Sequence, residues 1–137
     1  MSSKIESGIR HIPYSQQRVY DMLSDLNNIE KVKDRLPEDK VKDLKFDKDT
    51  VSVSAAPVGT VEMRIVEREE PKCIKFETSN SPLPFNFWIQ ILPVTEEESK
   101  MKLTIKLDIN PFMAKMVEKP LKEGIEKVAE ALAMIQY

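Results

Sequence analysis

The sequence is poor in the residues that cross-link chains, bind metals or wrap around phosphates. It contains one cysteine, one histidine and three glycines in 137 residues. A single cysteine, Cys73, excludes an intramolecular disulfide, and the lone His11 excludes a histidine cluster that could hold a metal. The glycines are scattered at Gly8, Gly59 and Gly124, so there is no glycine-rich phosphate loop. We therefore expect no metal and no cofactor.

The sequence also lacks an excess of charge of one sign and has no long apolar run. The chain has 21 basic and 23 acidic residues, and a net charge of -2 gives no overall field to attract nucleic acid. No window approaches the roughly 20 apolar residues of a membrane span, and Met1 to Glu6 lacks the apolar core of a secretory signal. We expect no nucleic-acid partner, no stable membrane insertion and a cytoplasmic location. The length suits one domain over residues 1–137.

Alternation of apolar and polar residues predicts strands over much of the chain. A first strand from Lys4 to Ile12 ends at Pro13. Six further runs follow, and the connections between them are too short for parallel crossovers, so neighbouring strands should be antiparallel. The clearest alternation is in the last run, whose apolar side chains should all face the core. The six runs cover residues 44–46, 51–55, 61–65, 72–79, 85–92 and 100–109.

A change of period to 3.6 predicts helices at two places. After Pro13, Ser15 is a plausible N-cap for a helix that stops near Asn27, and a second short helix should cover Ile29 to Leu36. At the other end, Asn110 caps a long helix with Pro111 in its first position. The apolar stripe of this helix must be buried against the sheet, and its residues are Met113, Met116, Val117, Leu121, Ile125, Val128, Leu132 and Ile135.

Two segments carry a resemblance to a known superfamily. One is the strand-to-helix passage from Ile12 to Leu26, with its Pro, a mid-helix aromatic and a closing Ser-Asp-Leu; the other is Asn110-Pro111-Phe112 leading into the terminal helix. With the order of elements, they make the whole chain resemble the SRPBCC superfamily, which has the START/Bet v 1-like helix-grip fold. The resemblance implies an α+β fold: a curved, seven-stranded antiparallel sheet around a long C-terminal helix, with two short helices after the first strand.

The superfamily includes polyketide cyclases and aromatases, lipid and sterol carriers, plant hormone binders, quinone-binding proteins and co-chaperones, so membership leaves several roles open. The resemblance also implies an apolar cavity between sheet and helix, suited to a small hydrophobic molecule. Each candidate lining residue could equally be a plain packing residue. The candidates are Phe112, Met113, Met116, Val117 and Pro120 on the helix, and Phe85, Phe87, Met63, His11 and Leu103 on the strands.

Three residues have a local role that the sequence leaves open. Pro120 should kink the helix, either to follow the sheet or to open the mouth of the cavity. Gly124 lies on the apolar stripe, where close approach of a strand is the simplest explanation. If Phe85 and Phe87 point inward, Trp88 points outward and could mark a partner surface or a homodimer; in the reversed register it lines the cavity.

These features favour a binding protein that is not an enzyme. The leading interpretation is a module that carries a lipid, a polyketide-like or a quinone-like molecule. The alternatives are an enzyme of the polyketide cyclase/dehydratase type and a protein-interaction module with a collapsed cavity. An enzyme needs an acid or base inside the cavity, and the inward positions of the strands offer few ionisable groups besides His11.

Overall fold

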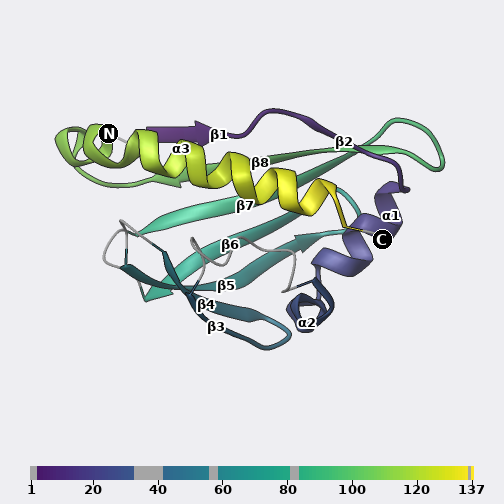
Figure 1. Cartoon of the computed structure of the whole chain (residues 1–137), viewed down its shortest axis with the longest axis horizontal. Helices are drawn as coiled ribbons and strands as arrows, with labels where there is room; N and C mark the ends of the chain where they lie inside the picture. Colours follow the sequence, from purple (N-terminus) through teal and green to yellow (C-terminus); the bar gives the residue numbers. More distant parts are fainter. Residues whose placement is uncertain (1–2, 33–41, 56–58, 81–83, 136) are drawn as a thin grey trace.

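The computed structural model describes residues 3–32, 42–55, 59–80, 84–135 and 137 (Figure 1). Strands form one antiparallel sheet in the order β1-β8-β7-β6-β5-β4-β3, and β2 also pairs with β8. The elements are β1 (Ser3–Glu6), β2 (Arg10–Ile12), α1 (Gln16–Leu23), the 3-10 turn η1 (Leu26–Asn28), α2 (Ile29–Val32), β3 (Lys42–Phe46), β4 (Thr50–Ala55), β5 (Gly59–Glu69), β6 (Cys73–Asn80), β7 (Phe85–Pro93), β8 (Ser99–Leu107) and α3 (Pro111–Ala133).

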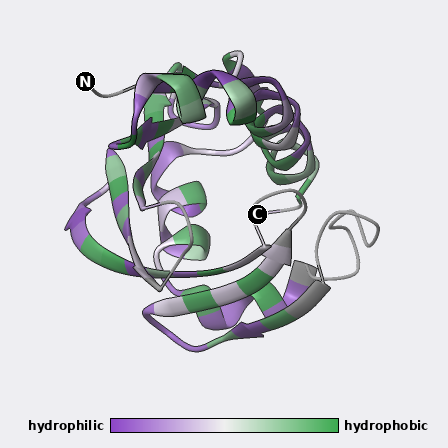
Figure 2. Cartoon of the chain, turned by 90° about the vertical axis from the view of Figure 1, so that its left-hand side faces the viewer, coloured by the Kyte–Doolittle hydropathy of each residue, from purple (hydrophilic) through white to green (hydrophobic). Residues whose placement is uncertain are grey.

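The sheet is curved, and α3 lies along it. Register shifts interrupt the β3–β4 and β5–β6 ladders, and such irregularities bend strands and increase their twist. Figure 2 shows the sheet curving around the interior of the molecule, with α3 across its open side. The predicted helix-grip arrangement and the antiparallel pairing of successive strands are both confirmed.

The inner face of β8 follows the predicted alternation. Met101, Leu103, Ile105 and Leu107 are each at most 7% exposed. On the outer face Lys100 and Lys106 are exposed, but Thr104 is buried and donates a hydrogen bond of 2.9 Å to Oε1 of Gln90 on β7. One face of this central strand therefore forms the core, while the other is covered in part by neighbouring polar side chains.

The predicted single first strand is wrong, because the chain between Lys4 and Ile12 forms two strands. Glu6 of β1 lies opposite Thr104, and Arg10 of β2 lies opposite Met101. The three residues between Glu6 and Arg10 therefore face only the two residues between Met101 and Thr104 on β8. Ser7 bridges the interruption: its N–H donates to the Leu103 carbonyl, and its hydroxyl accepts the Leu103 N–H, both at 2.8–2.9 Å. The extra residue reverses the facing of every side chain after it.

The short helices begin where the sequence predicts but are divided differently. The Ser15 hydroxyl accepts the Arg18 N–H at 3.2 Å and caps α1. This helix ends at Leu23, earlier than expected, and η1 follows with Asp25 as its cap. The second predicted helix is present as α2, and its predicted residues 33–36 lie outside the described residues.

The terminal helix α3 begins as predicted and buries a different stripe. Oδ1 of Asn110 accepts the Phe112 N–H at 2.8 Å, Pro111 is the first helical residue, and the helix continues through Pro120 to Ala133. Met113 and Met116, predicted to face the sheet, are 46% and 67% exposed. The buried residues of the helix are Ala114, Ile125, Ala129 and Leu132, with Val117, Leu121 and Val128 packed partly against the core.

Gly124 does not mark a close approach of a strand. A β-carbon built there meets no atom within 4 Å, so the prediction from its place on the stripe is wrong. In the part of the chain that the structure describes, no helix combines the length and apolarity required to span a membrane.

Candidate functional site

One flank of α3 is fixed to the edge of the sheet by hydrogen bonds. The helix packs against β1, β2 and β8. The Lys122 ammonium donates to the Glu6 backbone carbonyl, and Oε1 of Glu126 accepts the Gly8 backbone N–H. The Arg10 guanidinium donates to Oε2 of the same carboxylate at 2.9 Å. We call Glu118, Lys122 and Glu126 the anchored flank, because they follow each other at intervals of four and face β1 and β2.

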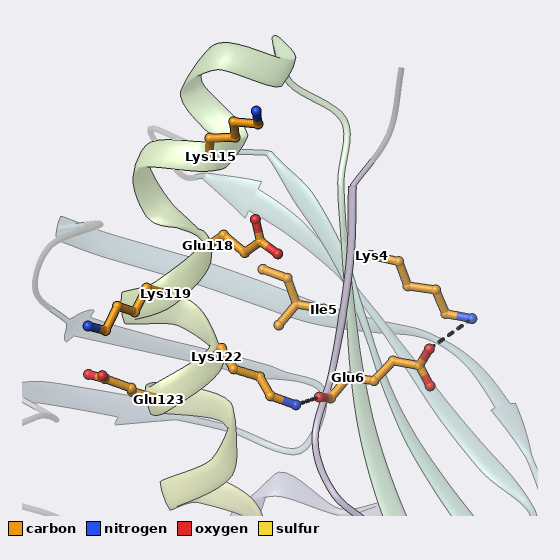
Figure 3. Close-up of a pocket in the computed structure, with 8 residues that line it drawn as sticks. All are labelled: Lys4, Ile5, Glu6, Lys115, Glu118, Lys119, Lys122 and Glu123. Atoms are coloured by element: carbon orange, nitrogen blue, oxygen red, sulfur yellow. Dashed lines mark hydrogen bonds and ion pairs between the residues drawn. The ribbon is translucent and has the colours of Figure 1, made fainter.

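A groove of about 670 Å³ runs between the anchored flank and β1 (Figure 3). Seven of its eight lining residues are charged, and Ile5 is the exception. In Figure 3 the Glu118 carboxylate points toward Ile5, and Lys122 reaches the Glu6 carbonyl. Such a lining is unlike the mostly apolar pockets that hold small hydrophobic molecules. The lining residues are Lys4, Ile5, Glu6, Lys115, Glu118, Lys119, Lys122 and Glu123.

The side chain of Glu6 is engaged on the outer face of the sheet. Its Oε2 accepts a hydrogen bond of 2.5 Å from the Lys102 ammonium, and Lys4 lies 3.4 Å from Oε1. The hydrogen bond from Lys102, with the positive charges of both lysines, lowers the pKa of Glu6. The Glu6 carboxylate is therefore ionised at neutral pH and links β1 to β8 through Lys102.

The opposite flank of α3 is apolar and open. Successive helical residues advance by roughly 100°, which places Met113, Met116 and Pro120 on the side away from Glu118 and Lys122. We call Met113, Met116 and Pro120 the open flank; Phe112, at its outer margin, is 73% exposed. Four of the predicted lining residues thus come together on the first turns of α3, next to the fifth, Val117, which packs partly against the core.

Four of the five strand residues of the predicted site lie on the inner face of the sheet. Phe85 and Leu103 are 8% and 0% exposed, whereas Phe87 and Met63 are only partly buried. The Phe87 ring packs edge-on against Phe76, with 5.4 Å between centroids. The structure brings Phe85, Phe87 and Leu103 together on β7 and β8, and Met63 lies two strands away on β5.

The facing predicted for His11 is wrong. Its imidazole is 53% exposed and lies 3.5 Å from the Glu98 carboxylate, while the neighbouring Ile12 is fully buried. The cause is the extra residue between β1 and β2, which turns the odd-numbered positions outward after Gly8. The structure therefore does not bring His11 together with the other candidates.

Trp88 faces outward, in the first of the two registers that the sequence left open. It lies opposite Lys75 and Thr104 in the ladders of β7, and the Lys75 ammonium is 5.6 Å from the centroid of its ring. The side chain is partly buried. The reversed register, with Trp88 inside, is excluded because Phe85, Ile89 and Ile91 are the buried residues of this strand.

The polar residues that are buried as a whole in the described chain carry hydroxyls rather than charges, although Nε of the partly exposed Arg10 is also buried. Ser7, Ser99 and Thr104 are each at most 5% exposed, and Ser99 donates to the Tyr14 carbonyl at 2.9 Å. The Tyr137 hydroxyl donates to the Leu132 carbonyl at 2.7 Å, and burial raises its pKa. Among the same residues, no three His, Cys, Asp or Glu side chains are grouped so as to hold a metal ion. The pKa values of hydroxyls lie far above neutral pH, which makes these groups poor general acids or bases there.

Sequence reasoning missed the anchored flank and the groove. The available signal was the series Glu118, Lys122 and Glu126, because residues four apart share one side of a helix and these three are charged. The partners Gly8 and Arg10 carried no such signal. Their contact with Glu126 depends on the interruption between β1 and β2, which only the pairing with β8 defines.

Comparison with known proteins agrees with this architecture. Residues 6–134 match the family model described as polyketide cyclase / dehydrase and lipid transport. Structures of similar fold include a truncated norcoclaurine synthase from Thalictrum flavum, at 13% identity and a TM-score of 0.76, with 97% of this chain and 92% of that one covered. A START superfamily protein from Mycobacterium smegmatis is 14% identical with a TM-score of 0.67, and 97% of this chain and 93% of that one are covered.

A protein from Thermus thermophilus is 19% identical with a TM-score of 0.69, and 96% of this chain and 94% of that one are covered. No curated protein sequence matches the chain. At these identities the structural neighbours show the fold alone, and that fold is the START/Bet v 1-like one the sequence predicts. The match over residues 6–134 shows that the chain belongs to the polyketide cyclase / dehydrase and lipid transport family.

Proposed function

We propose that the protein binds a small hydrophobic molecule, such as a lipid or a polyketide-like or quinone-like compound, in the cytoplasm and without chemical conversion. The ligand lies between the inner face of the sheet and α3 and enters along the open flank. His11 is not part of this site, because its imidazole is at the surface. The proposed lining consists of Phe112, Met113, Met116, Val117, Pro120, Phe85, Phe87, Met63 and Leu103.

The observation that carries the proposal is the incomplete cover of the inner face. Opposite residues on antiparallel strands face the same way, so Phe46, Val51 and Met63 form one inner row across β3, β4 and β5. Close backbone contacts of α3 in the described chain are concentrated on β1, β2 and β8, at the other edge of the sheet. Phe46 and Met63 are accordingly only partly buried. An apolar ligand would cover them.

The chemistry of the two flanks of α3 supports the same location. The groove on the anchored flank is lined by charges, whereas the open flank presents methionines, whose flexible and polarizable side chains adapt to differing ligands. Burial of apolar area at about 25 cal/mol per Å² would supply the affinity. The described buried polar residues Ser7, Ser99 and Thr104 carry no group that acts as an acid or base near neutral pH, which favours a carrier over the cyclase alternative.

The test is ligand binding by the purified protein in the absence of membranes. Native mass spectrometry should find a co-purified apolar molecule, and the delipidated protein should bind a fluorescent fatty-acid probe. Met116→Gln should weaken probe binding by about tenfold, because a polar amide replaces an apolar contact.

Met134→Gln is the matched control. Met134 is 66% exposed, against 67% for Met116, and lies roughly 27 Å further along the helix direction. Equal effects of the two substitutions would contradict the proposed entrance. A wild-type protein that carries no apolar molecule and binds no probe would contradict the function.

A further inference from the structure

The first ten residues of α3 expose an unusual amount of apolar surface. Phe112, Met113 and Met116 are 73%, 46% and 67% exposed. Eight large hydrophobic side chains are exposed in the described chain, and three of them lie within these five positions. Single exposed apolar residues are normal on a protein surface, but a group of this kind marks a site of contact.

Lysines accompany this apolar surface. Lys115 and Lys119 are exposed and follow Phe112 and Met116 by three residues, so they lie next to them on α3, at the border between the apolar surface and the groove that both lysines also line. The one acidic residue between Pro111 and Pro120 is Glu118, and in Figure 3 its carboxylate points toward Ile5, on the other side of the helix from Lys119. The outward surface of residues 111–120 is therefore basic and apolar, and it ends at the exposed Glu123, which points to the same side of α3 as Lys119 in Figure 3.

We infer that this segment docks on a lipid surface that carries anionic headgroups. The docking surface consists of Phe112, Met113, Lys115, Met116 and Lys119. Its apolar side chains enter the boundary between headgroups and acyl chains, and the lysine ammonium groups stay at the level of the phosphates. This inference extends the proposed function, because the same turns of α3 form the proposed entrance, and a docked entrance receives its apolar ligand directly from the bilayer.

Charge complementarity favours a lipid surface over a second copy of the chain. A symmetric dimer through this surface would bring each copy's lysines close to the other's, since the same patch meets itself in an isologous contact. The whole chain has a net charge of -2, so attraction to an anionic surface has to be local. The first turns of α3, at the left end of the molecule in Figure 1, would face the bilayer.

The test is flotation of the full chain with two kinds of vesicle, phosphatidylcholine alone and phosphatidylcholine with phosphatidylserine. The wild-type protein should float with the anionic vesicles, less with the neutral ones, and less again as salt screens the lysines. Lys115→Gln/Lys119→Gln should lower the affinity for anionic vesicles by about fivefold per lysine. Phe112→Ala should lower binding to both kinds of vesicle.

The control variant is Lys48→Gln/Lys72→Gln, which changes the net charge equally at exposed lysines on other turns and should bind like the wild type. The inference is overturned if the wild type shows no preference for anionic vesicles, or if the two double variants bind equally. It is also overturned if Phe112→Ala dissociates a dimer seen by analytical ultracentrifugation, because the surface then belongs to a second copy.

Failure of docking and failure of ligand binding can be told apart. Lys115→Gln/Lys119→Gln should keep its affinity for the fatty-acid probe in the absence of vesicles, since neither lysine belongs to the proposed ligand site. Met63→Gln should lose probe affinity and still float with anionic vesicles. Loss of both properties in both variants would overturn the docking inference, because the lysines would then act through the ligand site.

Discussion

The two halves of α3 differ in what they contribute to the molecule. Between Leu121 and Ala133, Ile125, Ala129 and Leu132 are buried and Glu126 binds Gly8 and Arg10. Between Pro111 and Pro120, Ala114 is the one residue below 9% exposure, and the larger apolar side chains face outward. The same 3.6-residue apolar pattern thus runs through a half of the helix that is exposed to solvent and a half that is packed against the sheet. The second half fixes the helix to the sheet, and the first half supplies the surface on which both proposals depend.

The largest contrast should come from truncating one apolar residue in each half. Ile125→Ala removes a side chain that is 3% exposed and should lower the free energy of unfolding by about 2–5 kcal/mol. Met116→Ala should change it by no more than about 0.5 kcal/mol, because its side chain is mostly in solvent. Urea denaturation of the two variants measures both values. Similar losses would show that the first half is packed as tightly as the second.

The hydrogen bonds of the anchored flank should have the next largest effect. Glu126→Ala leaves the Gly8 N–H and the Arg10 guanidinium without this partner and should cost about 1–3 kcal/mol. Glu123→Ala, one turn earlier and exposed at the groove, is the matched control and should be nearly neutral. If both substitutions cost the same, the carboxylate of Glu126 does not fix the helix.

Tyr137, which follows α3 and packs against its last turn, offers a smaller, pH-dependent effect on stability. Tyr137→Phe removes the hydrogen bond to the Leu132 carbonyl and should cost about 1 kcal/mol at neutral pH. Burial raises the pKa of Tyr137 above its ordinary value of 10.0, so the neutral hydroxyl favours the folded state. Its contribution is complete below pH 10 and is lost as the pH rises further. Thermal unfolding from neutral to alkaline pH should show a shallower loss for the variant than for the wild type.

The smallest expected effect is an increase, rather than a decrease, in the free energy of unfolding. Gly124→Ala should raise the free energy of unfolding by about 0.5–1 kcal/mol, because alanine favours the helix and its β-carbon would meet no atom within 4 Å. Ala131→Gly, later in the same helix, should lower stability by a similar amount. A destabilised Gly124→Ala variant would mean that a strand approaches this turn after all.

Local signals in the sequence were sufficient for much of the fold. Ser15, Asn110 and Pro111 act through their own and adjacent backbone groups, so their roles as caps and first helical residue could be predicted from a few neighbours. The alternation in β8 likewise depends on that strand alone. These features, with the order of elements, were enough to predict the helix-grip fold.

The features that sequence reasoning missed depend on partners distant in the chain. The facing of His11 is set by the pairing of β1 and β2 with β8, about ninety residues later. Met113 and Met116 satisfy the periodic pattern as well as Ile125 does, and the pattern does not report where the sheet ends beneath the helix. The candidate site is therefore predictable as a set of apolar residues on two elements, while the division of α3 into an anchored and an open flank is not.

The one-residue excess between β1 and β2 has a consequence for how the chain tolerates change in length. Because Ser7, Gly8 and Ile9 span only two residues of β8, removing one of them would make the ladder continuous and leave Arg10, His11 and Ile12 opposite their present partners. Ile12 would therefore stay buried, and the contact at risk would be that of the Gly8 N–H with Glu126, which lies within the shortened segment. A chain shortened by one residue at this edge of the sheet would thus keep its core covered and would weaken the attachment of the terminal helix at one point.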